Sequence, residues 1–245
     1  MTQPIPPLRH DSIARLDRLD LGTFDVGPGK RLIPITGWLL TTQAGRRLLI
    51  DTGFPPAYAT DERSTALADG LDSFGRLVEF THRHTITGAL ALHGLKETDI
   101  SHVLLSHSHI DHVGGLVLFT HAEIILSATE LALPRPLYFG AAQPMTWPKA
   151  RYRALSRTTQ ICQGLRFIAT PGHTPGHMSA LVQCSQGAFV LAIDAINRFS
   201  EPAEGYPDAS APATAALSGR RLAALARRHG AQLIPGHEPL ARPGP

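Results

Sequence analysis

Residues 106–112 read Ser-His-Ser-His-Ile-Asp-His and directly follow the apolar run at 103–105. Within them lie four ligand-type side chains: His107, His109, Asp111 and His112. A helix would turn His107 and His109 to different faces, whereas a loop at a strand end can turn all four inward. Without a metal, such crowded side chains would repel one another or stay unsatisfied. The stretch therefore predicts a metal site at the end of a buried strand.

Three later segments repeat this design, in which an apolar strand runs into a turn that carries a ligand-type residue. His173 follows a Pro-Gly turn, Asp194 ends the next strand but one, and His237 follows a second Pro-Gly turn. Glycine at such a turn allows backbone geometry that carries the next side chain over the sheet edge. Catalytic residues are commonly found on loops that a rigid sheet holds in place. These three residues are therefore candidates for the same chemistry.

The rest of the chain alternates between apolar strand patterns and helical patterns. Strands are expected at 14–26, 35–41, 47–51, 103–105, 123–126, 165–170, 178–184, 188–194 and 231–234, and helices at 86–95, from 113 to 119, and at 213–229. The last helix is expected to end at Gly230 and to turn inward Leu217, Leu222, Leu225 and Ala226. Strands followed by helices, twice over, favour a single domain over 1–245 with two sheets in a sandwich and helices outside.

Three segments stand apart from this pattern. Residues 1–12 are proline-rich and are expected to form an irregular arm. Residues 132–152 carry four prolines and most of the bulky aromatic residues, which is consistent with either a lid over a pocket or an irregular loop.

The third segment, residues 54–84, is long for a connection, and such connections are usually functional or partly helical. It holds apolar residues that are not expected to join the sheet core: Phe74, Leu77, Val78 and Phe80. Contiguous apolar surface often marks an interface, and symmetric dimers are the commonest assembly, so this insertion predicts a homodimer.

Composition excludes several other classes of protein. The 245 residues carry a net charge of only +3 and no run of like charges, so no nucleic-acid groove is expected. With two cysteines and no Cys-x-x-Cys pair, the chain suggests neither a disulfide framework nor a thiolate zinc site. No apolar run is long enough to cross a membrane, and the N-terminus lacks the pattern of an export signal. The expected location is the cytoplasm.

The order of these motifs resembles that of the metallo-β-lactamase superfamily along nearly the entire chain. The matching motifs are His-x-His-x-Asp-His at 107–112, Thr-Pro-Gly-His-Thr-Pro-Gly-His at 170–177, the aspartate at 194 and the Gly-His pair at 236–237. The resemblance implies an α/β fold of the αββα type, in which two mixed sheets form a sandwich with helices on the outer faces. It also implies two metal ions.

The resemblance further implies a role for each ligand residue. His107, His109 and His173 would hold the first metal. Asp111, His112 and His237 would hold the second, and Asp194 would bridge both. Two further residues would lie behind the centre without touching metal. Asp51 would orient ligand imidazoles, and His177 would either support the centre or simply form a buried hydrogen bond.

Such a ligand set suits hydrolysis. Neutral imidazoles and carboxylates suit zinc, with iron, manganese or cobalt as alternatives. Two metals about 3.5–4 Å apart can share a water and lower its pKa toward neutrality. The resulting hydroxide, bridging the metals, is expected to attack a substrate carbonyl that one metal polarises. Asp111, with one oxygen free of metal, would take the hydroxide proton and pass it to the leaving group.

Within the superfamily, the chain is most similar to the N-acyl homoserine lactonases. It has Asp194 where two-zinc β-lactamases carry cysteine, and only eight residues after His237, where glyoxalase II enzymes add a helical region. The resemblance therefore implies a dinuclear hydrolase that opens the lactone ring of a small molecule. The alternatives are a pyridoxolactonase-like esterase, a glyoxalase II-like thioesterase and a metal-binding scaffold without turnover.

Two residues depart from the lactonase pattern, and both are expected to contact the substrate. Ile110 stands where these lactonases often have an aromatic residue that lines the acyl pocket. Asn197 stands where they often have a tyrosine that hydrogen-bonds the lactone. Asparagine can donate a hydrogen bond but cannot act as a phenolic acid, so these departures leave the identity of the lactone or ester open.

Overall fold

The computed structural model describes residues 8–27, 31–139 and 141–239. Residues 1–7 of the expected arm lie outside this range; residues 8–10 form a 3-10 helix. Among the described residues two mixed sheets form, one of seven strands and one of five. The metallo-β-lactamase type of sandwich expected from the sequence is therefore confirmed.

The seven-stranded sheet has the order β4-β1-β2-β3-β5-β6-β7. Its strands are β1 (Ile13–Val26), β2 (Arg31–Thr42), β3 (Arg47–Ile50), β4 (Gly75–Glu79), β5 (Ile100–Leu104), β6 (Glu123–Ser127) and β7 (Arg151–Leu155). The five-stranded sheet has the order β12-β11-β10-β9-β8. Its strands are β8 (Thr159–Cys162), β9 (Leu165–Ala169), β10 (Met178–Cys184), β11 (Gly187–Ile193) and β12 (Gln232–Pro235). The pattern along the chain did not predict β7 or β8.

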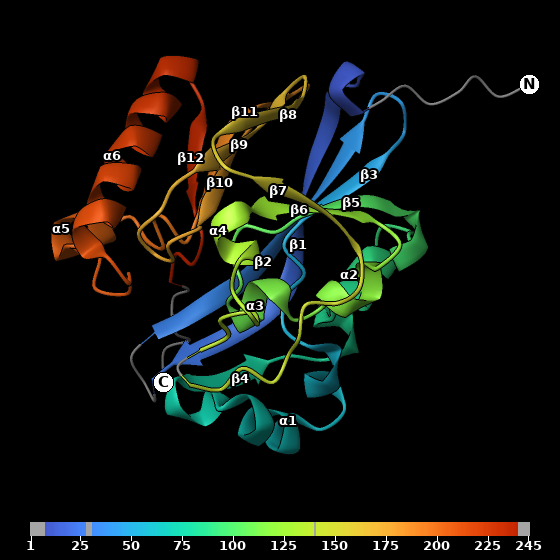
Figure 1. Ribbon diagram of the computed structural model, residues 1–245, viewed down its shortest axis with the longest axis vertical. Helices are drawn as coiled ribbons and strands as arrows, with labels where there is room; N and C mark the ends of the chain where they lie inside the picture. The colour runs from blue at the N-terminus through green and yellow to red at the C-terminus, as the bar shows by residue number, and fades with distance from the viewer. Residues whose placement is uncertain (1–7, 28–30, 140, 240–245) are drawn as a thin grey trace, which may run out of the picture.

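The helices lie outside the two sheets, with α6 beside β12 and with α1 and α2 on the other side of the molecule (Figure 1). They are α1 (Glu62–Asp69), α2 (Ile86–Ala91), α3 (Ile110–Val113), α4 (Ala128–Leu131), α5 (Glu201–Glu204) and α6 (Pro212–His229). Short 3-10 helices span Leu8–His10, Pro56–Ala59, Leu71–Ser73, His82–His84, Glu97–Asp99 and Leu116–Phe119. No helix within the described ranges is both long and apolar enough to cross a bilayer.

Apolar side chains between the sheets hold the sandwich together. Leu48 and Ile125 of the first sheet share a buried cluster with Phe167 and Val182 of the second. Each of these side chains is completely buried. Because such burial contributes about 25 cal/mol per Å² of apolar surface, this layer is a main source of stability. It fixes the strand ends from which the site residues project.

Helix α6 covers the outer face of the second sheet, but with a different stripe of residues than expected. Its buried residues include Ala215, Gly219, Leu222 and Ala226, whereas Leu217 is 49% exposed. A Cβ at position 219 would lie 1.9 Å from the hydroxyl oxygen of a tyrosine in the preceding loop. Only glycine fits beside that ring, and the buried stripe of α6 runs through small residues, so the inward position predicted for Leu217 is wrong.

The insertion at 54–84 contributes to the first sheet, which corrects another expectation. Its strand β4 pairs antiparallel with β1, and Leu77, opposite Phe24, is buried in the core beneath that sheet. Phe74 and Val78 remain 37% and 43% exposed. Sheet pairing therefore accounts for part of the apolar content, and the association of two copies stays a prediction.

The helix predicted from residue 113 begins earlier, at Ile110, inside the metal motif. It ends after one turn, where Gly114 and Gly115 pack against the turn that follows β3. A Cβ at Gly114 would lie 2.3 Å from the Pro55 nitrogen, and one at Gly115 would lie 2.7 Å from the Thr52 oxygen. These glycines let the motif pack directly on the loop that carries Asp51.

In the described part of residues 132–152, hydrogen bonds from side chains of the segment to its own backbone hold it in place. The Trp147 indole N–H donates to the Leu133 carbonyl oxygen at 2.8 Å, and the Tyr152 hydroxyl donates to the Pro148 carbonyl oxygen at 2.7 Å. The last two residues of the segment already belong to β7. Its chief contribution to the site is Phe139, described below.

Candidate metal centre

All seven predicted ligand residues converge where strands of the two sheets end. Their candidate ligand atoms form two groups, and within each group these atoms lie within 4.8 Å of one another. The first group is His107, His109, His173 and Asp194. The second is Asp111, His112 and His237. The groups match the two sets that the resemblance implied. They bring together segments that are separated by up to about half of the length of the chain.

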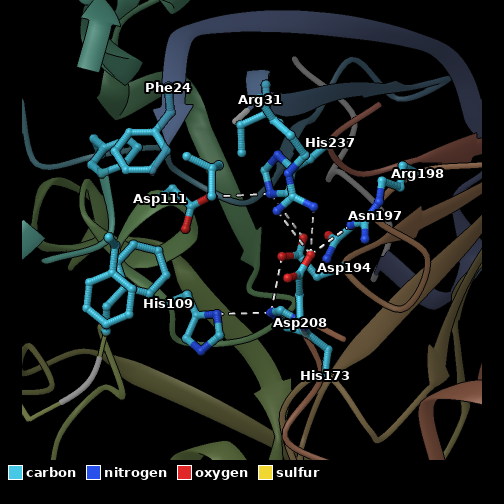
Figure 2. Close-up of a pocket in the computed structure, with 15 residues that line it drawn as sticks. Phe24, Arg31, His109, Asp111, His173, Asp194, Asn197, Arg198, Asp208 and His237 are labelled. Atoms are coloured by element: carbon cyan, nitrogen blue, oxygen red, sulfur yellow. Dashed lines mark hydrogen bonds and ion pairs between the residues drawn. The ribbon is translucent and has the colours of Figure 1, made fainter. Parts of the chain in front are cut away.

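Asp194 lies between the two groups (Figure 2). Its Oδ2 atom is 3.2 Å from His173 Nε2 and 3.9 Å from His107 Nε2. Its Oδ1 atom is 3.3 Å from both His112 Nε2 and His237 Nε2. Each oxygen of one carboxylate therefore faces a different group of ligands.

Several polar atoms of the centre are buried without a hydrogen-bond partner. They include Nε2 of His107 and of His112, Oδ1 of Asp194 and Oδ1 of Asp111. Each such atom costs about 1–3 kcal/mol when left unsatisfied. Cations would satisfy the imidazole nitrogens and the Asp194 oxygen together. The donor set, made of histidine and aspartate only, therefore fits divalent metal ions.

Electrostatics favours the metal-binding forms of His107, His173 and Asp194. At His112 and His237, burial opposes the charged form, but the neighbouring Asp111 and Asp194 outweigh it and raise the pKa of both rings. Burial lowers the pKa of His107 and of His173 well below the usual value, so both rings are neutral. Burial opposes ionisation of Asp194, but the neighbouring His237 and His112 outweigh it and hold the Asp194 pKa well below normal. Neutral imidazoles beside an ionised carboxylate are the states in which these groups bind metal.

Asp51 connects the loop after β3 to the metal motif. Its Oδ1 accepts the Ser106 N–H at 2.8 Å, and its Oδ2 accepts the Ser106 hydroxyl at 2.7 Å and the His112 Nδ1–H at 2.9 Å. Its backbone holds a left-handed φ of 62°, which is unfavourable for a non-glycine residue. Because Nδ1 of His112 is hydrogen-bonded to Asp51, its Nε2 faces the centre. Asp51 therefore acts as the supporting carboxylate that orients a ligand imidazole.

His177 lies behind Asp194 and contacts its backbone. His177 Nε2 accepts the Asp194 N–H at 3.2 Å, so Nδ1–H donates to the Thr170 hydroxyl oxygen at 2.9 Å. Burial lowers the pKa of His177 to about 3, which keeps this ring neutral. The second histidine of the Thr-Pro-Gly-His-Thr-Pro-Gly-His motif thus holds the end of β11, from which Asp194 projects.

Sequence reasoning missed a second buried carboxylate, that of Glu130 at the end of α4. It accepts hydrogen bonds from two loops that carry histidines. The only signal for it was the Ser-x-x-Glu pattern at 127–130, which is typical of a helix start. Ser127 does cap the Glu130 N–H at 3.0 Å. That pattern does not predict that the Glu130 side chain forms hydrogen bonds with the loops that carry the histidines.

Beside the ligands lies a cavity of about 370 Å³ with two unlike walls. One wall is apolar and consists of Phe24, Val26, Ile33, Phe54, Phe74 and Phe139. The other is polar and consists of Arg31, Asn197, Arg198 and Asp208. Phe24 lies across the pocket from Asn197 and Arg198 (Figure 2). Such a site suits a small molecule with an apolar part and a polar reacting part.

Asp208 joins the two arginines of the polar wall. Its Oδ2 accepts from Arg198 at 2.7 Å and from two nitrogens of Arg31 at 3.1 Å each. Arg198 also donates to Glu204 at 3.0 Å. These contacts fix both guanidinium groups, so the polar wall is built before any substrate enters.

The two expected substrate-contact residues differ in where they lie. Asn197 lines the pocket, is 6% exposed, and has a buried side-chain oxygen without a hydrogen-bond partner. Ile110 has no exposed surface and belongs to the core cluster beneath the first sheet. The turn of α3 that directs Asp111 to the site directs Ile110 away from it, so the expected substrate contact of Ile110 is wrong. Phe74 and Phe139, with ring centroids 4.9 Å apart, supply aromatic surface instead.

An αββα sandwich with histidine and aspartate ligands at its strand ends is the architecture of the metallo-β-lactamase superfamily. The family model described as "Metallo-beta-lactamase superfamily" matches residues 32–237, and the chain belongs to that superfamily. The protein is therefore an enzyme, a metal-dependent hydrolase.

Among similar proteins is an N-acyl homoserine lactonase of Bacillus thuringiensis, 30% identical over 217 residues that cover 86% of this chain and 84% of the relative. Metallo-beta-lactamase domain-containing protein 1 of Xenopus laevis is 32% identical over 163 residues, covering 64% and 62%. A solved N-acyl homoserine lactone hydrolase with N-hexanoyl-L-homoserine bound at its catalytic metal centre superposes with a TM-score of 0.78 at 27% identity, covering 93% and 94%. The similarity to the lactonase branch is thus confirmed.

Proposed function

We propose that this protein opens the ring of N-acyl homoserine lactone-like molecules at a centre of two divalent metal ions, most simply zinc. The observation that carries the proposal is the position of Asp194, whose two oxygens face two separate ligand groups beside a partly apolar pocket. The similarity to lactonases along most of the chain supports this substrate class.

In this proposal His107, His109 and His173 would hold the first ion, and Asp111, His112 and His237 would hold the second. Asp194 would serve both. When bound, the two ions supply a water of lowered pKa and an electrophile that polarises the lactone carbonyl. Such ions would satisfy the orphaned imidazole nitrogens and the Asp194 oxygen described above.

In this proposal Asp111 transfers the proton of the attacking water to the leaving group. Its Oδ2 faces the second ligand group, at 3.4 Å from Nε2 of both His112 and His237. Its Oδ1 has no hydrogen-bond partner, and the residue lines the substrate pocket. Oδ1 is therefore placed to take a proton from the attacking water and to pass it to the ring oxygen that leaves.

The pocket walls bind and orient the substrate. The apolar wall takes the acyl chain and excludes water from the reacting carbonyl. Asn197 lines the polar wall, and its side-chain oxygen is buried without a hydrogen-bond partner. Its side-chain NH2 group donates a hydrogen bond to the lactone. This amide stands in for the tyrosine of the lactonase pattern, but it offers no acid to the leaving group.

A substrate panel tests the proposal. Zinc-loaded protein is assayed on N-hexanoyl and N-decanoyl homoserine lactones, on an acyl thioester and on one β-lactam. We expect kcat/KM to be highest for the lactones, because a lactone releases a tethered oxygen whereas a β-lactam requires a proton on nitrogen. A preference for the β-lactam, or no lactone turnover with both ions bound, contradicts the proposal. A preference for the thioester would assign a glyoxalase II-like activity instead.

A further inference from the structure

We propose that Glu130 is a positioning residue that locks together the two histidine loops of the first ligand group and so sets the affinity of the ion held there. This inference rests on the proposed two-metal centre. Among the described residues, Glu130 forms no hydrogen bond or ion pair with a candidate ligand, and only 1% of its surface is exposed.

The contacts of Glu130 join segments that are far apart in the sequence. Its Oε2 accepts the Ser108 hydroxyl at 2.6 Å. Its Oε1 accepts the Thr174 hydroxyl at 2.6 Å and the Gly176 N–H at 3.2 Å. Ser108 lies between the first two histidines of the metal motif, and Thr174 directly follows His173. One carboxylate therefore holds the residues next to all three histidines of the first group.

The link continues into the wall of the pocket. The Ser108 hydroxyl oxygen, which donates to Glu130, also accepts the Leu137 N–H at 3.0 Å. The Ser108 carbonyl oxygen accepts the Tyr138 N–H at 3.0 Å. Phe139, the next residue, lines the substrate cavity. The same loop position thus ties the first ligand group to the apolar wall.

Gly176 allows this close approach. A Cβ at position 176 would lie 2.4 Å from Ser127 Oγ and 2.7 Å from Glu130 Cγ. No side chain fits there unless α4 moves away from the loop. The second glycine of the Thr-Pro-Gly-His-Thr-Pro-Gly-His motif is therefore explained by its packing on Glu130, independently of the hydrogen bonds.

The charge of Glu130 also bears on the centre. Among the described residues, no lysine, arginine or histidine nitrogen forms an ion pair with it. A buried carboxylate is costly unless hydrogen bonds or positive charges compensate it. Three donors compensate part of this cost, and a cation bound in the adjacent ligand group would compensate more. Because linkage is reciprocal, a carboxylate that cations stabilise raises the affinity of those cations.

Glu130→Gln tests the inference with little change of shape. The glutamine amide can accept from Thr174 and Gly176 or from Ser108, but not from all of them, and it carries no charge. Asp69→Asn is the matched control, since Asp69 is a buried carboxylate of α1 outside both ligand groups. Thr174→Val removes one of the donors and keeps the residue volume, so it serves if the glutamine variant does not fold.

Metal content after dialysis, rates of zinc release to a chelator, and melting temperatures of metal-free and metal-loaded forms are measured for each protein. We expect one of the two ions to leave Glu130→Gln at least tenfold faster than it leaves the wild type, and Thr174→Val to show a smaller change in the same direction. The stabilisation that metal confers should shrink in Glu130→Gln and stay unchanged in Asp69→Asn.

Equal zinc release from Glu130→Gln and wild type would overturn the inference while leaving the two-metal centre intact. An equal loss of melting temperature in the metal-free and metal-loaded forms, with unchanged release, would assign Glu130 to general stability and also overturn it. A wild-type protein that holds fewer than two ions would contradict the proposed function itself, and the inference with it.

Discussion

The ligand cluster and the pocket wall lie side by side but are built in different ways. Every ligand residue follows a strand or lies in the one-turn helix α3, and buried groups such as Asp51 and His177 hold these segments from behind. The wall is assembled from strands β1 and β2, the insertion at 54–84 and the loop that carries Phe139, together with Asn197, Arg198 and Asp208.

This difference separates the chemistry from the choice of substrate. The cluster agrees with the superfamily at every candidate ligand position, whereas the wall departs from the lactonase pattern at Asn197. Changes in the cluster should therefore abolish turnover on every substrate. Changes in the wall should redistribute activity among substrates. The predictions below test this contrast.

The largest effect is expected from Asp111→Asn, within the cluster. Loss of general acid–base assistance typically lowers a rate about 10²–10⁴-fold, so kcat should fall by that factor while KM changes only a few-fold. The measurement is steady-state kinetics on N-hexanoyl homoserine lactone, with metal content determined on the same sample. A variant that retains two ions and near-normal kcat would show that Asp111 moves no proton.

A smaller effect is expected from Asn197→Tyr, in the wall. The tyrosine hydroxyl replaces the hydrogen bond of the amide and adds a phenolic donor for the leaving oxygen. Because one hydrogen bond contributes about 1 kcal/mol, kcat/KM on acyl homoserine lactones should rise about fivefold. Asn197→Ala is the control and should lower it. If the tyrosine variant loses lactone activity while the alanine variant keeps it, Asn197 does not contact the substrate as proposed.

The smallest effect on turnover is expected from the exposed part of the insertion. We predict that the protein forms a dimer through this region, in which Leu67 of α1 is 77% exposed and Val78 lies on the edge strand β4. Light scattering at micromolar concentration should give twice the 26.4 kDa chain mass. Val78→Lys should shift the mass toward the monomer with little change in kcat, because edge lysines oppose strand pairing. A monomeric wild type would contradict this prediction.

The sequence predicted the cluster well because short motifs at strand ends carry their own geometry. The order of the motifs was enough to expect that His107 and His237 would meet, although they lie 130 residues apart. It did not predict β8, which is four residues long. Short strands rely on pairing with a neighbour, here β9, rather than on a pattern of their own.

The wall and the supporting groups were harder to predict, because tertiary packing decides them. Ile110 was assigned to the pocket from its position in the motif, but the early start of α3 turns it into the core. Glu130 fits a local capping pattern, and only the folded chain shows that it bonds to Ser108 and Thr174. Sequence periodicity contains no information on such contacts between distant segments.

The most direct test of the central claim is a titration of metal-free protein with zinc, in which the opening of N-hexanoyl homoserine lactone is followed by the acid it releases. We predict no turnover without zinc and a rise in activity that reaches its plateau at two ions per chain. Full activity in metal-free protein, a plateau at one ion, or no lactone opening at any zinc concentration would contradict the account.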